Sequence, residues 1–255
     1  MLLNGKNYST SMVKISLSGS SGRMGIAIEN LIKKQPKKFK LISKFARISN
    51  MRENDLSSTY DVIVDFSHSD NLEKLLKIAT SSKTPIVIGT TGFTTDHMQK
   101  IKEASLQIPI LYAPNTSIGA NLVAYLSAKA AKILEKYDVE IVEAHHRYKK
   151  DAPSGTALMI GKRIAEAKNV NFDDVAVFER ASKKSARAQD EIGFSSIRGG
   201  GIFGDNEVIF AGDNEVINIS TRALSRDVFA EGALLAAQWV IEKEANGLYS
   251  MQDVF

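Results

Sequence analysis

"VKISLSGSSGRMG", residues 13–25, places a short β-branched run, a loop with glycines at positions 19, 22 and 25, and the start of a helix in direct succession. Such a loop lets the backbone approach a pyrophosphate, while the first N–H groups of the helix supply donors and positive potential. The spacing is GxxGxxG rather than GxGxxG, so on its own it fits a structural turn equally well. Its place at the head of an alternating series favours dinucleotide binding.

Strand-like and helical stretches continue to alternate as far as residue 116. This order predicts right-handed crossovers and a parallel sheet covered by helices on both faces, a Rossmann-like doubly wound α/β domain. Ligands of such sheets bind at the carboxyl ends of the strands. The strand runs are VKISLS (13–18), FKLISKFA (39–46), YDVIVDFS (60–67), TPIVIGT (84–90) and IPILYAP (108–114).

The pattern changes after Ser117, where a second domain of the α+β class is predicted. Its strands are bounded by glycine and Asx turns, which is typical of an antiparallel or mixed sheet. The closing segment 227–255 has apolar residues near helical spacing and is predicted as a helix that could pack on either domain. The other predicted elements are a helix at 118–137, a strand at 138–146, a helix from Gly155, and strands at 193–199, 206–212 and 215–223.

Composition narrows the class of protein. The 255 residues include no cysteine, which excludes disulfides and thiolate metal sites and fits a cytoplasmic protein. The net charge of +4 is too mild and too dispersed to favour a nucleic-acid partner. No apolar stretch approaches the roughly 18 residues of a membrane helix. Residues 1–12 contain one lysine and no apolar core, so they are predicted to be a polar extension rather than a signal peptide.

The strand ends supply candidate cofactor residues. Near the end of the second strand, where NAD-binding folds place an acidic residue for the ribose, the sequence has Lys44 and Arg47. These cations could meet the 2′-phosphate of NADP, although they could equally be solvated surface charges. "GTTG" (89–92) and "APNT" (113–116) follow later strands, where the nicotinamide half of a dinucleotide would lie. Each of these turns alone would be ordinary.

"EAHHRYKKDAPSGTA", residues 143–157, gathers half of the four histidines beside several cations. Ser154 can N-cap the helix that Gly155 begins, which leaves N–H groups suited to a carboxylate. His145 and His146 end a strand on opposite faces. A histidine can deliver a proton, and a lysine near it, such as Lys149, can share that work or hold a substrate anion. Adjacent histidines rarely chelate one ion, so no metal site is predicted.

The alternative interpretation of this segment is a polar loop with a capped helix, which would leave the histidines and cations a coincidence. His68 and His97 are single histidines, better interpreted as cap or surface residues, and no role is assigned to them.

This segment resembles the defining segment of the dihydrodipicolinate reductases, also called 4-hydroxy-tetrahydrodipicolinate reductases, of bacterial lysine and diaminopimelate biosynthesis. From Val13 onward further segments resemble that family in the same order. The sequence departs from the family's pattern in having Ala46 and Arg47 where many members have an acidic residue, and Asn206 where members often have histidine. The further segments are GSSGRMG, DVIVDFS, GTTGF, APNTSIGAN, IGFSSIRGG and GLYSMQDVF.

The resemblance implies a cytoplasmic, homotetrameric reductase that uses NADPH or NADH and no metal. Its substrate would be a small cyclic dicarboxylate, 4-hydroxy-tetrahydrodipicolinate, which is reduced to tetrahydrodipicolinate. Residues 13–116 and 226–255 would form a discontinuous dinucleotide-binding domain. Residues 117–225 would form the substrate-binding and tetramerisation domain.

The resemblance also implies roles for individual residues. His145 matches the acid/base histidine and Lys149 the proposed proton donor, while His146, Gly155 and Thr156 match the residues that hold the dicarboxylate. With the two cations of the second strand, the expected cofactor residues are Gly19, Ser20, Ser21, Gly22, Arg23, Met24, Lys44, Arg47, Gly89, Thr90, Thr91, Ala113, Pro114, Asn115 and Thr116.

Two other functions compete with this hypothesis. One is a dinucleotide-binding sensor that has lost catalysis, against which the intact His145, Lys149, Gly155 and Thr156 argue. The other is a different two-domain oxidoreductase that acts on an amino or keto dicarboxylic acid. A reduction assay with each candidate substrate separates them.

Overall fold

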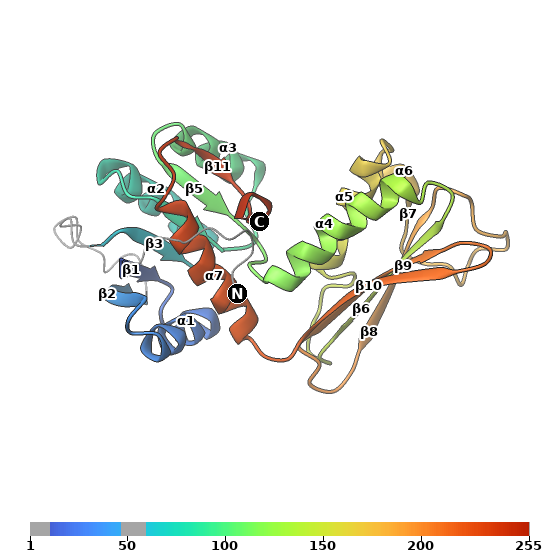
Figure 1. Cartoon of the computed structure of the whole chain (residues 1–255), viewed down its shortest axis with the longest axis horizontal. Helices are drawn as coiled ribbons and strands as arrows, with labels where there is room; N and C mark the ends of the chain where they lie inside the picture. Colours follow the sequence, from blue (N-terminus) through green and yellow to red (C-terminus); the bar gives the residue numbers. More distant parts are fainter. Residues whose placement is uncertain (1–10, 47–59, 255) are drawn as a thin grey trace. The chain divides into compact units, whose positions relative to one another are not determined.

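The computed structural model describes residues 11–46 and 60–254, which divide into two compact units (Figure 1). Unit 1 contains Met1–Ile118 and Arg226–Phe255, and unit 2 contains Gly119–Ser225. Most of the predicted polar extension at residues 1–12 lies outside the described residues. Arg47, one of the expected cofactor residues, also lies outside them.

Unit 1 is built on a sheet of six parallel strands in the spatial order β11-β5-β4-β3-β1-β2. The predicted parallel α/β sheet is therefore confirmed. The strands are β1 (Val13–Ser18), β2 (Phe39–Phe45), β3 (Val62–Asp65), β4 (Ile86–Ile88), β5 (Pro109–Tyr112) and β11 (Gly247–Tyr249).

Helices cover both faces of this sheet because its central strands are apolar on both sides. Along β3, Val62 and Val64 belong to one buried cluster and Ile63 to the other, as the period of two in a strand requires. The first cluster includes α1 and α7, and the second includes α2 and α3. The helices are α1 (Arg23–Lys34), α2 (Leu72–Ser81), α3 (Thr95–Ser105) and α7 (Asp227–Val240).

The closing segment does not form the single helix predicted from its apolar spacing. The helix ends at Val240, and Gly247–Tyr249 pairs with β5 as an edge strand before the short 3₁₀ helix η4 (Met251–Val254). The ring of Tyr249 packs edge-on against Trp239 of α7 at 5.1 Å. Strand pairing and this aromatic contact outweigh the local helical pattern, so the prediction is wrong beyond Val240.

Unit 2 contains a mixed five-stranded sheet in the order β10-β9-β6-β8-β7, as predicted in kind. Strands β9 and β10 are antiparallel to their neighbours, whereas β6, β8 and β7 run parallel. Helices α4 and α5 supply the rest of the buried core. The elements are α4 (Ile118–Ile133), β6 (Asp138–His145), α5 (Gly155–Ala167), α6 (Phe172–Val175), β7 (Ala176–Val177), β8 (Ile192–Arg198), β9 (Gly204–Ala211) and β10 (Val216–Ala223).

Helix α4 ends at Ile133, four residues before the predicted end at Tyr137. The Tyr137 hydroxyl donates to the Glu215 carboxylate at 2.6 Å, and its ring lies so close to Gly212 that a Cβ there would approach the ring to 2.8 Å. These contacts with the turn between β9 and β10 hold Tyr137 outside the helix.

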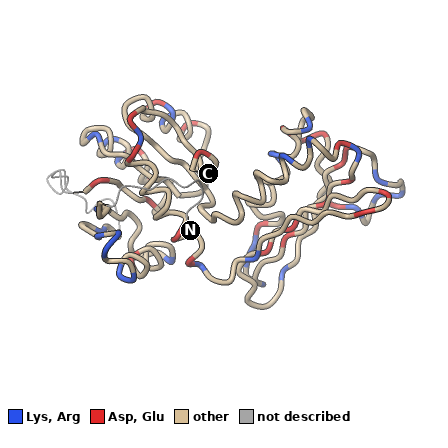
Figure 2. The backbone as a smooth tube through the Cα atoms, in the orientation of Figure 1, with Lys and Arg blue, Asp and Glu red and all other residues tan. Residues whose placement is uncertain are grey.

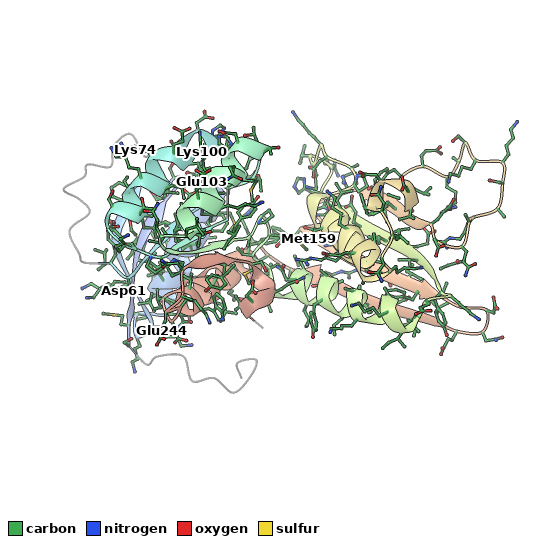
Figure 3. The ribbon with its side chains drawn as sticks, turned by 90° about the horizontal axis from the view of Figure 1, so that it is seen from above. Asp61, Lys74, Lys100, Glu103, Met159 and Glu244 are labelled. Atoms are coloured by element: carbon green, nitrogen blue, oxygen red, sulfur yellow. The ribbon has the colours of Figure 1, made fainter. Side chains whose placement is uncertain are left out.

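Charged residues of both signs are interspersed along the backbone of both units (Figure 2). On α2 and α3, for example, Lys100, which is labelled in Figure 3, binds the carboxylates of Glu73 and of Asp96, the latter at 2.8 Å. Exposed pairs of this kind are each worth about 0 to 1 kcal/mol, so they contribute little to the fold. No helix in the described ranges is both long and apolar enough to cross a membrane.

A buried acid lies at the carboxyl end of β3. Asp65 is 1% exposed and accepts a hydrogen bond from the Thr90 hydroxyl at 2.6 Å. Burial raises the pKa of Asp65, and the hydroxyl groups of Thr90, Ser67 and Ser18 offset only part of that rise. The carboxyl therefore lies among neutral donors rather than beside a cation.

Replacing Gly232 tests the attachment of α7 to unit 1. A Cβ at Gly232 would lie 1.7 Å from the Thr116 carbonyl oxygen, a backbone atom that cannot move cheaply. Gly232→Ala gains about 1 kcal/mol in helix propensity but loses more through this clash, since overpacking costs about 1 to 3 kcal/mol or more. Urea unfolding should show a net loss of stability. Glu231→Ala, at the exposed neighbouring position, is the control; equal stability of the two variants would contradict the packing.

The raised pKa of Asp65 predicts a pH dependence of stability. An unfolded aspartate has a pKa of about 3.9, and the folded value is higher, so between the two the folded state binds the extra proton and stability falls as pH rises. Asp65→Asn removes this loss. The difference in unfolding free energy between variant and wild type should therefore shift in favour of the variant from pH 4 towards neutrality. A difference that is independent of pH would show that folding does not raise the pKa of Asp65.

Candidate functional site

The glycine loop of unit 1 has the geometry that a pyrophosphate requires. Gly19 has φ +80°, and a Cβ there would lie 2.2 Å from the Phe66 carbonyl oxygen; at Gly25 it would lie 2.3 Å from the Gly19 carbonyl oxygen. Larger residues therefore cannot form this tight turn. Gly22 is the N-cap of α1 and makes no side-chain cap, so no side chain of its own occupies the start of the helix. The backbone is shaped to bring an anion to these N–H groups.

A cavity of about 380 Å³ lies beside this loop. It brings together three of the expected cofactor residues and Ala46, which follows β2, with residues that follow β3, to none of which the sequence analysis assigned a cofactor role. Ala46 contributes no charge to the lining of this cavity, whereas Asp70, which follows β3, contributes a carboxylate. The cavity is lined by Gly19, Ser21, Gly22, Ala46, Phe66, Ser67, His68, Asp70 and Asn71.

Several other expected cofactor residues are already bonded within unit 1. The Thr90 hydroxyl donates to Asp65, and the Thr116 hydroxyl donates to the Phe229 carbonyl at 2.6 Å. A Cβ at Gly89 would lie 2.2 Å from the Phe66 ring. These residues shape and hold the strand ends, and what they can offer a ligand is mainly backbone.

Lys44 of β2 is an ion-pair partner of α1. Its ammonium lies 3.0 Å from a Glu29 carboxylate oxygen, and the same carboxylate also binds Lys33 at 2.9 Å. His68 and His97 are caps, as predicted: His68 accepts from the Asp70 N–H at 3.4 Å, and His97 forms a capping box at the start of α3.

The second group of candidate residues lies in unit 2, at the carboxyl end of β6. His145 is the last residue of the strand, and its Nδ1 lies 2.6 Å from a carboxylate oxygen of Glu143 on the same face. Burial lowers the pKa of His145; Lys149 and Arg198 lower it further, while Glu143 acts against them. His146 lies just beyond the strand, with a buried Nδ1 that has no hydrogen-bond partner among the described residues.

Glu143 is 1% exposed, and its carboxylate is fully engaged. The Arg198 guanidinium donates to its two oxygens at 2.6 and 2.8 Å, and the Ser154 N–H donates at 3.2 Å. Burial alone would raise the pKa of Glu143, but hydrogen bonds from Arg198, Ser196 and His145 outweigh it and lower the pKa. The group is thus a buried, ionised acceptor.

The basic residues of the 143–157 segment join the same cluster. The Lys149 ammonium lies 2.8 Å from the Asp151 carboxylate, and Arg198 also donates to the Asp151 carbonyl at 2.6 Å. Burial raises and the Lys149 hydrogen bond lowers the pKa of Asp151, with a net lowering. A continuous chain of polar contacts therefore leads from Lys149 to His145.

Helix α5 begins beside this cluster. The Ser154 hydroxyl accepts from the Ala157 N–H at 3.2 Å, which confirms the predicted N-cap. Gly155 is exposed, and a Cβ there would meet nothing within 4 Å. Open space therefore lies in front of the first turn of the helix, next to Thr156, where an anionic group could bind.

Sequence reasoning found His145 and Lys149 but missed Glu143, the partner of His145, and Arg198, which binds Glu143. The period of two along β6 does place Glu143 on the face of His145, whereas Arg198 lies 55 residues after Glu143 and is brought in by the parallel pairing of β6 with β8. Within the described parts of the chain, no three His, Asp or Glu side chains form a group that could hold a metal ion.

Comparison with known proteins relates both groups of residues to one family. Residues 13–116 match the family model of the dihydrodipicolinate reductase N-terminus, and residues 119–255 match that of the C-terminus. The 4-hydroxy-tetrahydrodipicolinate reductase of Rickettsia bellii is 44% identical over 245 residues, which cover 96% of this chain and 95% of that protein. That of Zymomonas mobilis is 42% identical over 248 residues, 96% of this chain and 97% of that protein.

Solved structures show the same fold. A dipicolinate-bound dihydrodipicolinate reductase from Paenisporosarcina superposes with a TM-score of 0.79 at 23% identity, and the match covers 96% of this chain and 100% of that one. The diaminopimelate (DAP) dehydrogenase of C. glutamicum has a TM-score of 0.54 at 14% identity, covering 94% and 92%, which is a likeness of fold alone. The two family models and the relatives at 42–44% identity carry the assignment. The chain belongs to the dihydrodipicolinate reductase family.

Proposed function

We propose that this protein is an NAD(P)H-dependent oxidoreductase that reduces 4-hydroxy-tetrahydrodipicolinate to tetrahydrodipicolinate in lysine and diaminopimelate biosynthesis. Relatives at 42–44% identity over nearly the whole chain bear the name of this reductase. The single structural observation that carries the proposal is the cluster of His145, Glu143, Arg198 and Lys149 beside the open start of α5. It combines a proton donor with groups that attract carboxylates.

Unit 1 is proposed to bind the dinucleotide. The glycine loop and the start of α1 would hold the pyrophosphate, and the cavity beside Ala46 would take the adenosine ribose. When bound, the reduced nicotinamide supplies a hydride. The turns at 89–91 and 113–116 would line the nicotinamide half with backbone groups.

Unit 2 is proposed to bind the dicarboxylate and supply the proton. The N–H groups of Gly155 and Thr156, with His146 and Lys149, would hold the two carboxylates of the ring. Overall the reduction takes up one hydride and one proton and releases the 4-hydroxyl group as water. Burial lowers the pKa of His145 and so disfavours the imidazolium. The approach of two negatively charged carboxylates would raise that pKa again and favour the imidazolium, which donates the proton.

Homotetramer formation and a cytoplasmic location belong to the same proposal. On the face of the unit 2 sheet opposite its helices, Ile197 and Val216 are 51% and 59% exposed, which suits an interface with further copies of the chain. The absence of cysteine from the sequence suits a reducing compartment.

Substitution of the proton-donating residues tests the reaction. His145→Ala and Lys149→Ala should each lower kcat by about 10² to 10⁴-fold, because the substrate loses its proton source. The dissociation constant of NADPH should stay unchanged, since the glycine loop lies in the other unit. The substrate is prepared by condensing pyruvate with aspartate semialdehyde, and NADPH oxidation is followed by absorbance.

Lys150→Ala, at the exposed neighbouring lysine, is the matched control for that experiment and should keep wild-type kcat. Near-normal turnover by the His145 and Lys149 double variant, with chemistry limiting the rate, would overturn the assigned roles. A wild-type protein that leaves NADPH unoxidised would overturn the function itself.

The cations of the second strand predict the cofactor preference. Wild type should use NADPH at least as well as NADH, because Ala46 presents no carboxylate to repel a 2′-phosphate. Arg47→Glu should shift kcat/KM towards NADH by less than about tenfold, the usual size of a single charge contact, with kcat little changed because the 2′ position is remote from the hydride. Lys44→Gln should shift it less, since Lys44 is paired with Glu29. Strong NADH preference in wild type with no effect of Arg47→Glu would contradict this.

A further inference from the structure

Glu143 and Arg198 surround His145 without lying at the open start of α5. We propose that both are positioning residues for His145: Glu143 keeps the Nδ1 proton in place so that Nε2 is the nitrogen that exchanges a proton with the substrate, and Arg198 fixes the Glu143 carboxylate in the required orientation. This inference rests on the proposed function for the identity of the substrate. Its structural part concerns the imidazole ring alone.

The first step of the argument is the tautomer. An ionised carboxylate can only accept hydrogen bonds, so the contact of 2.6 Å between Glu143 and His145 requires a proton on Nδ1. In the neutral ring Nε2 is then the basic nitrogen, and in the imidazolium it carries the transferable proton. Within the described parts of the chain Nε2 makes no hydrogen bond, and the His145 side chain is 12% exposed.

The second step is the hold on the carboxylate. A lone glutamate can rotate about its side-chain bonds, but Arg198 grips both oxygens at 2.6 and 2.8 Å in a fork. Arg198 is itself held by its bonds to the carbonyls of Asp151 and Ile197, at 2.6 and 2.7 Å. The carboxylate plane, and with it the imidazole, therefore has one favoured orientation.

The third step is the space in front of Nε2. A Cβ at Gly204 of β9 would lie 3.0 Å from this nitrogen, tighter than almost all real contacts. Nε2 is the ring nitrogen that does not contact Glu143. Because position 204 is a glycine, no side chain at this position of β9 obstructs Nε2. Glu143 thus binds Nδ1, and Gly204 leaves space beside Nε2.

The charges around His145 predict in which direction its pKa shifts when each of them is removed. Its own strand contributes Glu143, β8 contributes Arg198, and the following loop contributes Lys149, which is paired with Asp151. Strand β9 presents only the neutral Gly204 and Asn206 here. Glu143 favours the imidazolium, whereas Lys149 and Arg198 disfavour it. Removing Glu143 and removing Arg198 should therefore shift the titration of the ring in opposite directions.

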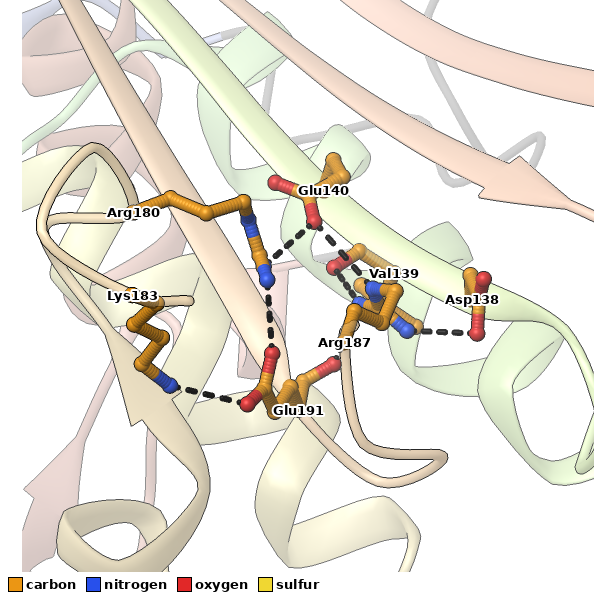
Figure 4. A network of polar contacts seen from close by, with 7 residues as sticks. All are labelled: Asp138, Val139, Glu140, Arg180, Lys183, Arg187 and Glu191. Carbon is orange, nitrogen blue, oxygen red and sulfur yellow. Dashed lines mark hydrogen bonds and ion pairs between the residues drawn. The ribbon is translucent and has the colours of Figure 1, made fainter. Parts of the chain in front are cut away.

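The experiment compares Glu143→Gln, Arg198→Gln and Glu140→Gln in the full chain. Glu140 is the matched control: it lies on the same strand, where it binds Arg180 at 3.0 Å and Arg187 at 3.4 Å (Figure 4). It precedes His145 by five residues, so the period of two places it on the other face of the strand. The pKa and tautomer of His145 are read from the ring nitrogen shifts by NMR, assigned by the loss of signals in His145→Asn. Fold and cofactor binding are checked by circular dichroism and NADPH titration.

We expect Glu143→Gln to lower the pKa of His145 and mix its tautomers, Arg198→Gln to raise the pKa, and Glu140→Gln to change neither. The acidic limb of the kcat/KM profile should move with the ring. In Glu143→Gln kcat should fall by about 10- to 100-fold, part of the 10² to 10⁴-fold that an acid–base group supplies. Gly204→Ala, which changes no charge, should lower kcat while the tautomer stays as in wild type.

Shifts of the same sign in Glu143→Gln and Arg198→Gln, or a wild-type tautomer in Glu143→Gln, would overturn the inference. If Glu143→Gln fails to fold, Arg198→Gln and Gly204→Ala still decide it. The ring titration needs no substrate, so it gives its answer even if wild type does not reduce 4-hydroxy-tetrahydrodipicolinate. Conversely, normal wild-type turnover with unaltered titrations would keep the proposed function and reject this positioning role.

Discussion

A carboxylate withdrawn from water must find donors, and the site of unit 2 is organised around that requirement. Glu143 takes donors from three parts of the chain: His145 on its own strand, Arg198 on β8 and the Ser154 N–H at the start of α5. Removing one member of such a group leaves a buried charge uncompensated, which costs several kcal/mol. Because of this cost, the contacts with Glu143 hold the end of β6, the end of β8 and the start of α5 together.

Unit 1 contains a buried acid of the opposite kind. Asp65 lies, like Glu143, near the carboxyl end of a central strand and is equally buried, yet hydroxyl groups rather than cations surround it. Burial consequently raises the pKa of Asp65, whereas donors of positive charge lower that of Glu143. Two carboxyl groups with the same exposure therefore have pKa values shifted in opposite directions because of their neighbours.

Much of the fold could be predicted because its signals are local. The glycine loop, the alternation of strand and helix, and the Ser154 cap each depend on a few adjacent residues. The edge strand at Gly247–Tyr249 could not be predicted, because its partner β5 ends 135 positions earlier in the chain (247 against 112). His145 could be found because its signal lies in one short segment, whereas Arg198 was missed because the pairing of β6 with β8 brings it in from a distant part of the chain. The pairing of Lys44 with Glu29 is likewise not local and was not predicted. The functional roles of the cofactor residues remain predictions.

The return of α7 and β11 to unit 1 has a consequence for biosynthesis of the chain. Until residues 226–249 have been translated, the β5 edge of the unit 1 sheet has no partner strand. One face of β1, β3, β4 and β5 is then covered by α1 but not yet by α7. Unit 2 is contiguous, so its strands and helices are all synthesised before that point. During translation the inserted unit can therefore complete its core first. The nascent N-terminal half must meanwhile keep exposed apolar strands from pairing with other chains, a task suited to chaperones.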